Sequence, residues 1–139
     1  MIRTLLTALV LSALSMTAHS KDAAFQQCMA TNDQGSSGTT RCFANYLQRL
    51  ETEQKKLIVN IRKSLADQSP DGKNHEAAQA NFSKAQIEWM RFSKSDCDVR
   101  NNLFGLGNAA VVAEVDCYVQ HYEIRNKQLK ALLSDYLAR

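Results

Sequence analysis

Three stretches of the chain repeat apolar residues at the three- and four-residue spacing of an α-helix. The most regular series lies in residues 109–137, where the steps alternate between four and three: Val111, Val115, Tyr118, Tyr122, Arg125, Leu129, Leu132 and Tyr136. Such a series keeps one face of a helix against a core. Because the chain has only five glycines and one proline, a sandwich or barrel with many turns is disfavoured.

Two further long helices are predicted before this one. In residues 40–66 the apolar steps are mostly three and four, with Gln54 interrupting the series: Phe43, Leu47, Leu50, Leu57, Ile61 and Leu65. In residues 74–101 the corresponding stripe is typical of bundle packing: Ala78, Phe82, Ala85, Trp89 and Phe92. A short helix is expected over residues 22–32.

The segments between these helices carry turn and loop residues. Residues 33–40 are rich in Gly, Ser and Thr, residues 67–73 contain the only proline, and residues 104–108 contain two glycines. The sequence therefore predicts an all-α fold. We expect a small antiparallel bundle of three long helices plus a short N-terminal helix.

The first 20 residues are typical of a secretory signal peptide. Arg3 supplies a positive start, residues 5–14 are mainly apolar, and the small residues Ala18 and Ser20 suit a cleavage site after Ser20. The apolar run is shorter than the roughly 20 residues that span a bilayer, so a retained membrane anchor is disfavoured.

The remaining chain, residues 21–139, has the composition of one globular domain. Apolar residues make up 45% of the full sequence and charged residues 22%, which are ordinary values. The full chain has 17 basic and 14 acidic residues; loss of Arg3 leaves 16 and 14, a net charge of +2. That charge is too weak to indicate a nucleic-acid partner. We expect a periplasmic or secreted domain without stable membrane insertion.

The four cysteines, Cys28, Cys42, Cys97 and Cys117, all lie in the exported part. An even number in an exported chain indicates two disulfides, for which three pairings exist. We favour the local pairing Cys28–Cys42 and Cys97–Cys117. The alternative is a zinc site built from all four thiolates. It is disfavoured because no C-x-x-C pair is present and the compartment is oxidising. We expect no metal and no cofactor.

The sequence contains few residues or motifs that indicate a catalytic site. Beyond the signal peptide the chain has two histidines, His75 at a predicted helix start and His121 beside the apolar face of the last helix. We expect His75 to be exposed and His121 to lie at the boundary of the core. No zinc-protease, serine-hydrolase or phosphate-loop motif occurs, and disulfides leave no thiol nucleophile. The sequence therefore does not indicate an enzyme.

Arg125 lies within the apolar series of the last helix. Arginine is rarely buried without a partner, so we expect an ion pair with Glu51 or Glu53. The alternative is an anion-binding arginine in a groove. Trp89 is expected in the core, where its indole N–H would need an acceptor.

Charge is unevenly distributed along the chain. Residues 41–63 carry a local charge of +4, whereas residues 104–124 contain three acidic residues and no lysine or arginine. The simplest explanation of this charge distribution is that these residues lie on solvent-exposed faces of their helices. The alternative is that the glycine-containing loop and the following helix start bind a basic partner. The residues of that candidate surface are Leu106, Asn108, Val111, Val112, Glu114 and Asp116.

Several of these residues together resemble a known family. The order Gln86, Trp89, Phe92 and Cys97, then a glycine-containing loop, then Cys117, Arg125 and Leu129, resembles the LprI-like lysozyme-inhibitor family of small exported helical proteins. The resemblance spans roughly residues 28–129. The chain departs from the family pattern at three positions. Ser93 and Lys94 replace an Arg-Asp pair, and Tyr122 replaces a threonine.

The resemblance implies an inhibitor-type binding protein that blocks lysozyme or a related peptidoglycan hydrolase by occluding its cleft. The expected partner is therefore a protein. Two alternatives stay open: an immunity protein against a toxin delivered into the periplasm, and an envelope structural or stress protein without an enzyme target. The sequence leaves the oligomeric state open.

Overall fold

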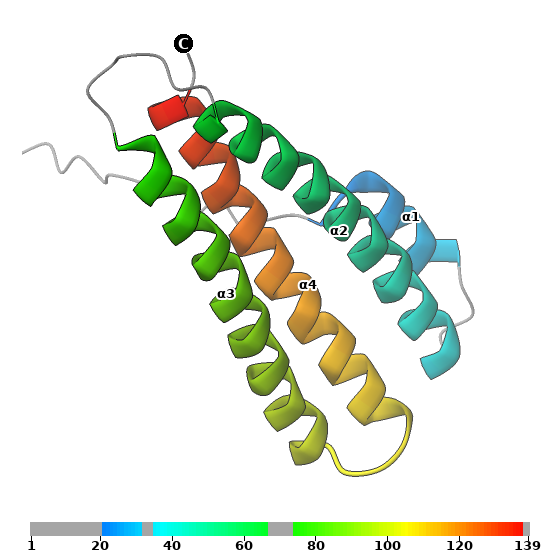
Figure 1. Ribbon diagram of the computed structural model, residues 1–139. Coiled ribbons are helices and arrows are strands. Elements are labelled where there is room, and N and C mark those ends of the chain that lie inside the picture. The colour runs from blue at the N-terminus through cyan, green and yellow to red at the C-terminus, as the bar shows by residue number, and fades with distance from the viewer. Residues whose placement is uncertain (1–20, 32–34, 67–73, 138–139) are drawn as a thin grey trace, which may run out of the picture.

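The computed structural model describes residues 21–31, 35–66 and 74–137, and its described part is an all-α bundle (Figure 1). The predicted signal peptide and the predicted turn 67–73 lie outside the described residues. The elements are α1 (Ala23–Thr31), α2 (Ser36–Ala66), α3 (His75–Leu103), α4 (Asn108–Ala131) and the π-helical turn η1 (Leu132–Leu137). The predicted fold class is confirmed.

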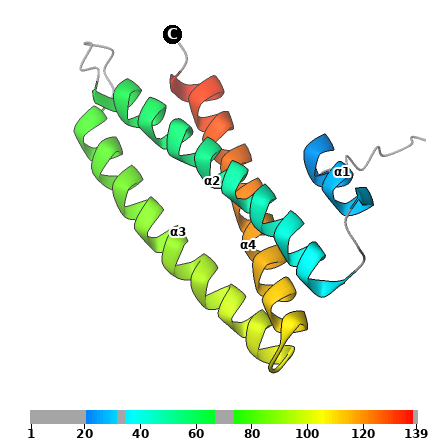
Figure 2. The same ribbon diagram turned by 90° about the vertical axis from the view of Figure 1, so that its right-hand side faces the viewer.

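Helix α4 is the centre of the bundle. It packs along both α2 and α3, whereas α1 lies against the N-terminal half of α2 (Figures 1 and 2). Helices α2 and α3 approach each other near the end of α2 and the start of α3, and they diverge toward the loop that joins α3 to α4 (Figure 2). Among the described helices, none has a stretch that is both long and apolar enough to cross a membrane.

Two predicted boundaries were wrong. Helix α2 begins at Ser36 rather than Thr40. The N–H groups of Gly38 and Thr39 donate to the Gly35 carbonyl at 3.0 and 3.2 Å and close its first turn. Residues 132–137, predicted as the end of an α-helix, form a π-helical turn.

Both predicted disulfides are confirmed. Cys28–Cys42 joins α1 to α2 with a Cα–Cα distance of 5.6 Å, and Cys97–Cys117 joins α3 to α4 at 5.5 Å. Both distances are ordinary for a disulfide. Each bond closes a segment of the chain and so lowers the entropy of the unfolded state.

The core has two apolar clusters. The first joins α1, α2 and α4: Phe25, Cys42, Phe43, Tyr46, Leu50 and Val119. The second joins α2, α3 and α4: Ile61, Leu65, Phe82 and Leu129. The prediction for α2 is therefore confirmed, since its apolar series lies in these clusters or packs against them.

Polar side chains are buried on the same helix faces. Gln54 follows Leu50 of the first cluster and precedes Ile61 of the second, and it is buried. Asn126 of α4 is buried as well, and its side-chain N–H donates to the Leu50 carbonyl at 2.9 Å. Gln86 of α3 is the third buried amide. The bond from Asn126 fixes the register of α4 against α2.

The apolar stripe predicted for α3 was wrong in part. Phe82 is buried and Trp89 is half-buried, whereas Phe92 is 61% exposed, and Ala78 and Ala85 are exposed as well. The buried residues of α3 are instead Phe82, Gln86, Ser93 and Cys97. Helix α3 contacts α4 along its length but leaves α2, so the face that a third helix would cover stays open.

The predicted series of α4 is confirmed in part. Leu129 lies in the second cluster, and Val115, Tyr122 and Leu132 pack against the two clusters, whereas Val111 is 42% and Tyr136 70% exposed. The buried residues of α4 are Ala110, Cys117, Val119, Asn126 and Leu129. Because α4 is covered by α2 on one side and α3 on the other, its burial spreads around the helix rather than following one stripe.

Candidate interaction surface

The loop between α3 and α4, with the helix ends beside it, exposes an unusual number of large apolar side chains. Figure 1 shows this loop at the end of the bundle opposite η1. We call the set the apolar tip: Val99, Leu103, Phe104, Leu106 and Val111. Leu103 is 79% exposed and Leu106 is completely exposed. A cluster of exposed apolar groups is typical of a protein-binding surface.

Two glycines give the apolar tip its backbone shape. Gly105 has a φ of +75° and Gly107 has a φ of +114°, in the region that residues with a side chain rarely adopt. The N–H of Phe104 donates to the Asn101 carbonyl at 3.2 Å and that of Gly105 to the Asn102 carbonyl at 3.3 Å. These bonds close α3, and the chain then turns at once into α4.

Side-chain contacts hold the apolar tip in place from three directions. The buried Cys97–Cys117 disulfide ties α3 to α4 near its base. The Asn101 amide donates to the Glu114 carboxylate at 2.5 Å. The Asn108 amide donates to the Ser36 hydroxyl at 2.8 Å, which connects the start of α4 to the start of α2. An exposed loop held this way loses less entropy on binding.

The six residues of the candidate surface divide into two groups. Leu106, Asn108 and Val111 are exposed, whereas Val112 packs against the first core cluster. The two carboxylates are half-buried and engaged within the protein: Glu114 accepts from Asn101, and Asp116 pairs with Lys21 at 2.8 Å. The exposed character of this surface is therefore mainly apolar rather than acidic.

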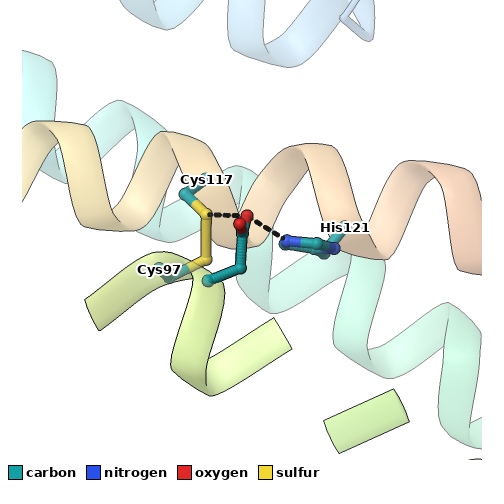
Figure 3. Close-up of side chains that lie close together, drawn as sticks. Cys97, Cys117 and His121 are labelled. Carbon is teal, nitrogen blue, oxygen red and sulfur yellow. Dashed lines mark hydrogen bonds and ion pairs between the residues drawn. A yellow bond between two sulfur atoms is a disulfide. The ribbon is translucent and has the colours of Figure 1, made fainter. Parts of the chain in front are cut away.

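A second cluster lies at the contact between α3 and α4, beside the Cys97–Cys117 disulfide (Figure 3). His121 Nε2 lies 2.9 Å from the Asp96 carboxylate, and Arg100 lies 3.5 Å from the same carboxylate. The hydrogen bond with His121 is the main cause that lowers the pKa of Asp96 below its ordinary value, and the nearby Arg100 charge adds to it. Phe92 packs its ring edge-on against His121 at 5.4 Å.

The sequence analysis did not single out Asp96 as a functional residue, although a signal was present. Asp96 precedes Cys97, and His121 follows Cys117 by one helical turn. Once these two cysteines are paired, the helical spacing places the carboxylate and the ring near the same disulfide. His75 also differs from the prediction, because it is half-buried rather than exposed.

The ion pair predicted for Arg125 is wrong. Arg125 is half-buried and its guanidinium donates to Gln128 at 3.2 Å, while Glu53 pairs with Lys130 at 2.6 Å. Among the described residues no acidic side chain pairs with Arg125, and burial lowers its pKa. Trp89 is half-buried and packs edge-on against Tyr122 at 5.0 Å.

A family model matches most of the chain. The model of the family described as lysozyme inhibitor LprI matches residues 28–129, which includes both disulfides, the apolar tip and the Asp96–His121 cluster. No curated protein and no solved structure matches the chain. The matched segment covers more than half of the sequence, so the chain belongs to the LprI family of lysozyme inhibitors.

Proposed function

We propose that this protein is an exported inhibitor, not an enzyme, that blocks lysozyme or a related peptidoglycan hydrolase by placing its apolar tip in the substrate cleft. Family membership supports the inhibitor class. The observation that carries the surface is Leu106, a completely exposed leucine between two glycines with positive φ. The predicted signal peptide supports a periplasmic or secreted site of action.

The apolar tip has the shape that an enzyme cleft can accept. It is the narrow turn between two antiparallel helices, so it projects from the end of the bundle (Figure 1). Substrate clefts are concave and largely apolar with a few polar groups. Burial of a leucine or phenylalanine side chain contributes about 1.5–3 kcal/mol. Burial of Leu103, Phe104 and Leu106 together would therefore contribute about 4.5–9 kcal/mol before the cost of association is subtracted.

Charge has a secondary part in this proposal. With a predicted net charge of +2 after signal removal, the protein and a basic lysozyme repel each other at long range, which slows association. Glu114 and Asp116 are poorly placed to attract a basic enzyme, because Glu114 already accepts a hydrogen bond from Asn101 and Asp116 already pairs with Lys21. We therefore expect affinity to depend on apolar burial, and added salt to speed association by screening the repulsion rather than to weaken binding.

The test is a cell-wall clearing assay with the oxidised protein, starting at Lys21, against lysozymes of several structural types. Leu106→Asp places a charge on the apolar tip. The matched control is Val59→Asp, since Val59 is 62% exposed on α2 and lies outside the tip. We expect stoichiometric inhibition by the wild type and the control, and at least tenfold weaker inhibition by Leu106→Asp, or about 1.4 kcal/mol.

Two results would contradict the proposal in different ways. Equal inhibition by Leu106→Asp and Val59→Asp would show that the apolar tip is not the binding surface. No inhibition of any lysozyme by the wild type would contradict the inhibitor function itself. A toxin gene beside this gene would then favour the immunity alternative, and an envelope pull-down without a hydrolase would favour the structural one.

A further inference from the structure

Helix α2 carries an outer surface with basic but no acidic side chains. Between residues 41 and 63, half of the exposed residues of this helix are lysine or arginine, and none is aspartate or glutamate. The two acidic residues of the segment, Glu51 and Glu53, are only partly exposed. Groups of about four to eight basic residues on one helix are typical of contacts with anionic lipid. We call this set the basic face: Arg41, Arg49, Lys55, Lys56, Arg62 and Lys63.

The basic face points away from the rest of the bundle. Figure 2 shows α2 in front of α4, and the residues that α2 buries in the core, such as Leu50 and Ile61, lie on the other side of the helix. An α-helix rises about 1.5 Å per residue, so the basic face is about 33 Å long. Its cations are spread along this length and do not converge on one point, as they would around a single small anion.

Ion pairs within the protein neutralise little of this charge. Arg49 pairs with Asp22 at 2.7 Å. In the part of the chain that the structure describes, no acidic side chain pairs with the other five cations of the basic face. On α3, by contrast, Lys94 pairs with Asp98 of the same helix at 2.7 Å. The charge of α2 is therefore available to an anion outside the protein.

We propose that the basic face binds the anionic headgroups of a phospholipid bilayer. A bilayer presents phosphates across a plane, which matches an elongated array of cations on one side of a helix. Each lysine or arginine held near such a surface gains electrostatic free energy, and the long side chains reach the phosphates without movement of the helix. The contact is electrostatic and reversible, and it requires no helix to enter the hydrocarbon of the bilayer.

An exposed valine within the basic face favours a bilayer over a soluble polyanion. Val59 is 62% exposed. Lys55, Lys56 and Lys63 are three or four residues away, so they lie about one helical turn from it on the same side of α2. At a bilayer this apolar side chain enters the headgroup region while the ammonium groups meet phosphates. A soluble polyanion offers the valine no apolar surface.

The basic face and the apolar tip lie on different parts of the bundle. Helix α2 begins near the tip, where the Ser36 hydroxyl accepts from the Asn108 amide. Its second half, with four of the six cations, runs toward the opposite end of the bundle (Figure 1). A bilayer bound to this half leaves the tip free, so an inhibitor would be held at the cell envelope with its tip available. That consequence depends on the proposed function, whereas the lipid contact itself does not.

Sedimentation with vesicles tests the lipid contact on the oxidised protein starting at Lys21. Vesicles that contain phosphatidylglycerol and phosphatidylcholine are compared with vesicles of phosphatidylcholine alone. We expect binding to the anionic vesicles only, and weaker binding as added sodium chloride screens the charges. Lys55→Gln/Lys56→Gln/Lys63→Gln should weaken binding about a hundredfold, at about fivefold per charge. The matched control Lys84→Gln/Arg91→Gln/Lys94→Gln removes the same charge from exposed positions of α3 and should bind nearly as tightly as the wild type.

Three results would contradict the lipid contact. If the wild type does not bind the anionic vesicles, the proposal is wrong. Equal losses in the two triple variants would show that net charge controls binding and the basic face does not. Soluble polyglutamate that binds the wild type more tightly than the vesicles do would assign the basic face to a polyanion instead. The cell-wall clearing assay without vesicles measures inhibition separately, and there the α2 variant should inhibit like the wild type.

Discussion

The ammonium group of Lys21 lies 2.8 Å from the carboxylate of Asp116 and 4.2 Å from the centre of the Phe43 ring. This contact joins the start of the described chain to the middle of α4. Both side chains are about one quarter to one third exposed. Asp116, which the sequence analysis placed on the candidate binding surface, is therefore engaged by a contact within the protein.

Replacement of Asp116 by asparagine should lower stability without lowering inhibition. Loss of a partly buried ion pair costs about 1 kcal/mol, and the remaining amide still reaches Gln120. We expect Asp116→Asn to lower the free energy of unfolding in urea by about that amount. The control is Glu88→Gln, whose pair with Arg91 is exposed and should contribute almost nothing. A fall in inhibition with unchanged stability would assign Asp116 to the binding surface instead.

Asp22 should make stability depend on pH in the acid range. Its carboxylate accepts two hydrogen bonds from Arg49, at 2.7 and 2.9 Å, and one from the Phe25 N–H at 2.7 Å. The hydrogen bond from Arg49 is the largest cause that lowers the pKa of Asp22 below its ordinary value. Its stabilisation is therefore complete above the ordinary carboxyl pKa of about 4 and is lost as the pH falls through the lowered value.

The test compares the wild type with Asp22→Asn by urea unfolding between pH 7 and pH 2. Asparagine still caps α1, so the variant isolates the charge. We expect the wild type to be more stable at pH 7 by less than about 1 kcal/mol, since the pair is exposed. That difference should shrink below pH 4 and disappear at the lowest pH. A difference that stays constant over the whole range would show that the ion pair with Arg49 does not act through charge.

Ile61 should be one of the most sensitive positions of the core. It is completely buried in the second apolar cluster, where it packs with Leu65, Phe82 and Leu129. Ile61→Ala should lower the free energy of unfolding by about 2–5 kcal/mol, because it removes apolar contacts and leaves a cavity. Val59→Ala, two residues away on the exposed side of α2, should change it by less than about 0.5 kcal/mol. Similar losses in the two variants would contradict the assigned face of α2.

The sequence predicted the helices and disulfides well because both signals are local. The spacing of Phe43, Leu50, Ile61 and Leu65 identifies the buried face of α2 without knowledge of the other helices. Pairing of neighbouring cysteines also needs no long-range information, and it was confirmed. The helix start at Ser36 was missed because a Gly/Ser/Thr-rich segment favours loops as readily as a helix start.

Prediction failed where two or more helices decide the outcome. Phe92 fits the helical stripe of α3 but is exposed, with its ring edge-on against His121 of α4. Within the described part of the chain no carboxylate pairs with Arg125, and Glu53 pairs with Lys130 and accepts from Asn126 instead. Periodicity describes one helix face at a time, so it does not say how far a neighbouring helix extends or which of two cations reaches a carboxylate.

The backbone conformation of Gly107 should determine how strongly the protein inhibits lysozyme through its apolar tip. Its φ of +114° is strained for any residue with a side chain, although no atom lies within 4 Å of an added Cβ. Gly107→Ala should therefore cost about 1–3 kcal/mol or shift the turn, and either effect displaces Leu106. The matched control is Gly35→Ala, where an added Cβ also meets nothing within 4 Å and φ is not in the strained range.

Urea unfolding and the cell-wall clearing assay together separate these effects. We expect Gly107→Ala to lower both stability and inhibition, and Gly35→Ala to leave inhibition unchanged. If the turn relaxes, stability recovers but inhibition stays low, because the exposed leucine no longer projects from the end of the bundle. Full inhibition by Gly107→Ala would mean that binding does not require the observed geometry of the apolar tip. The binding surface would then have to be sought on another face of the bundle.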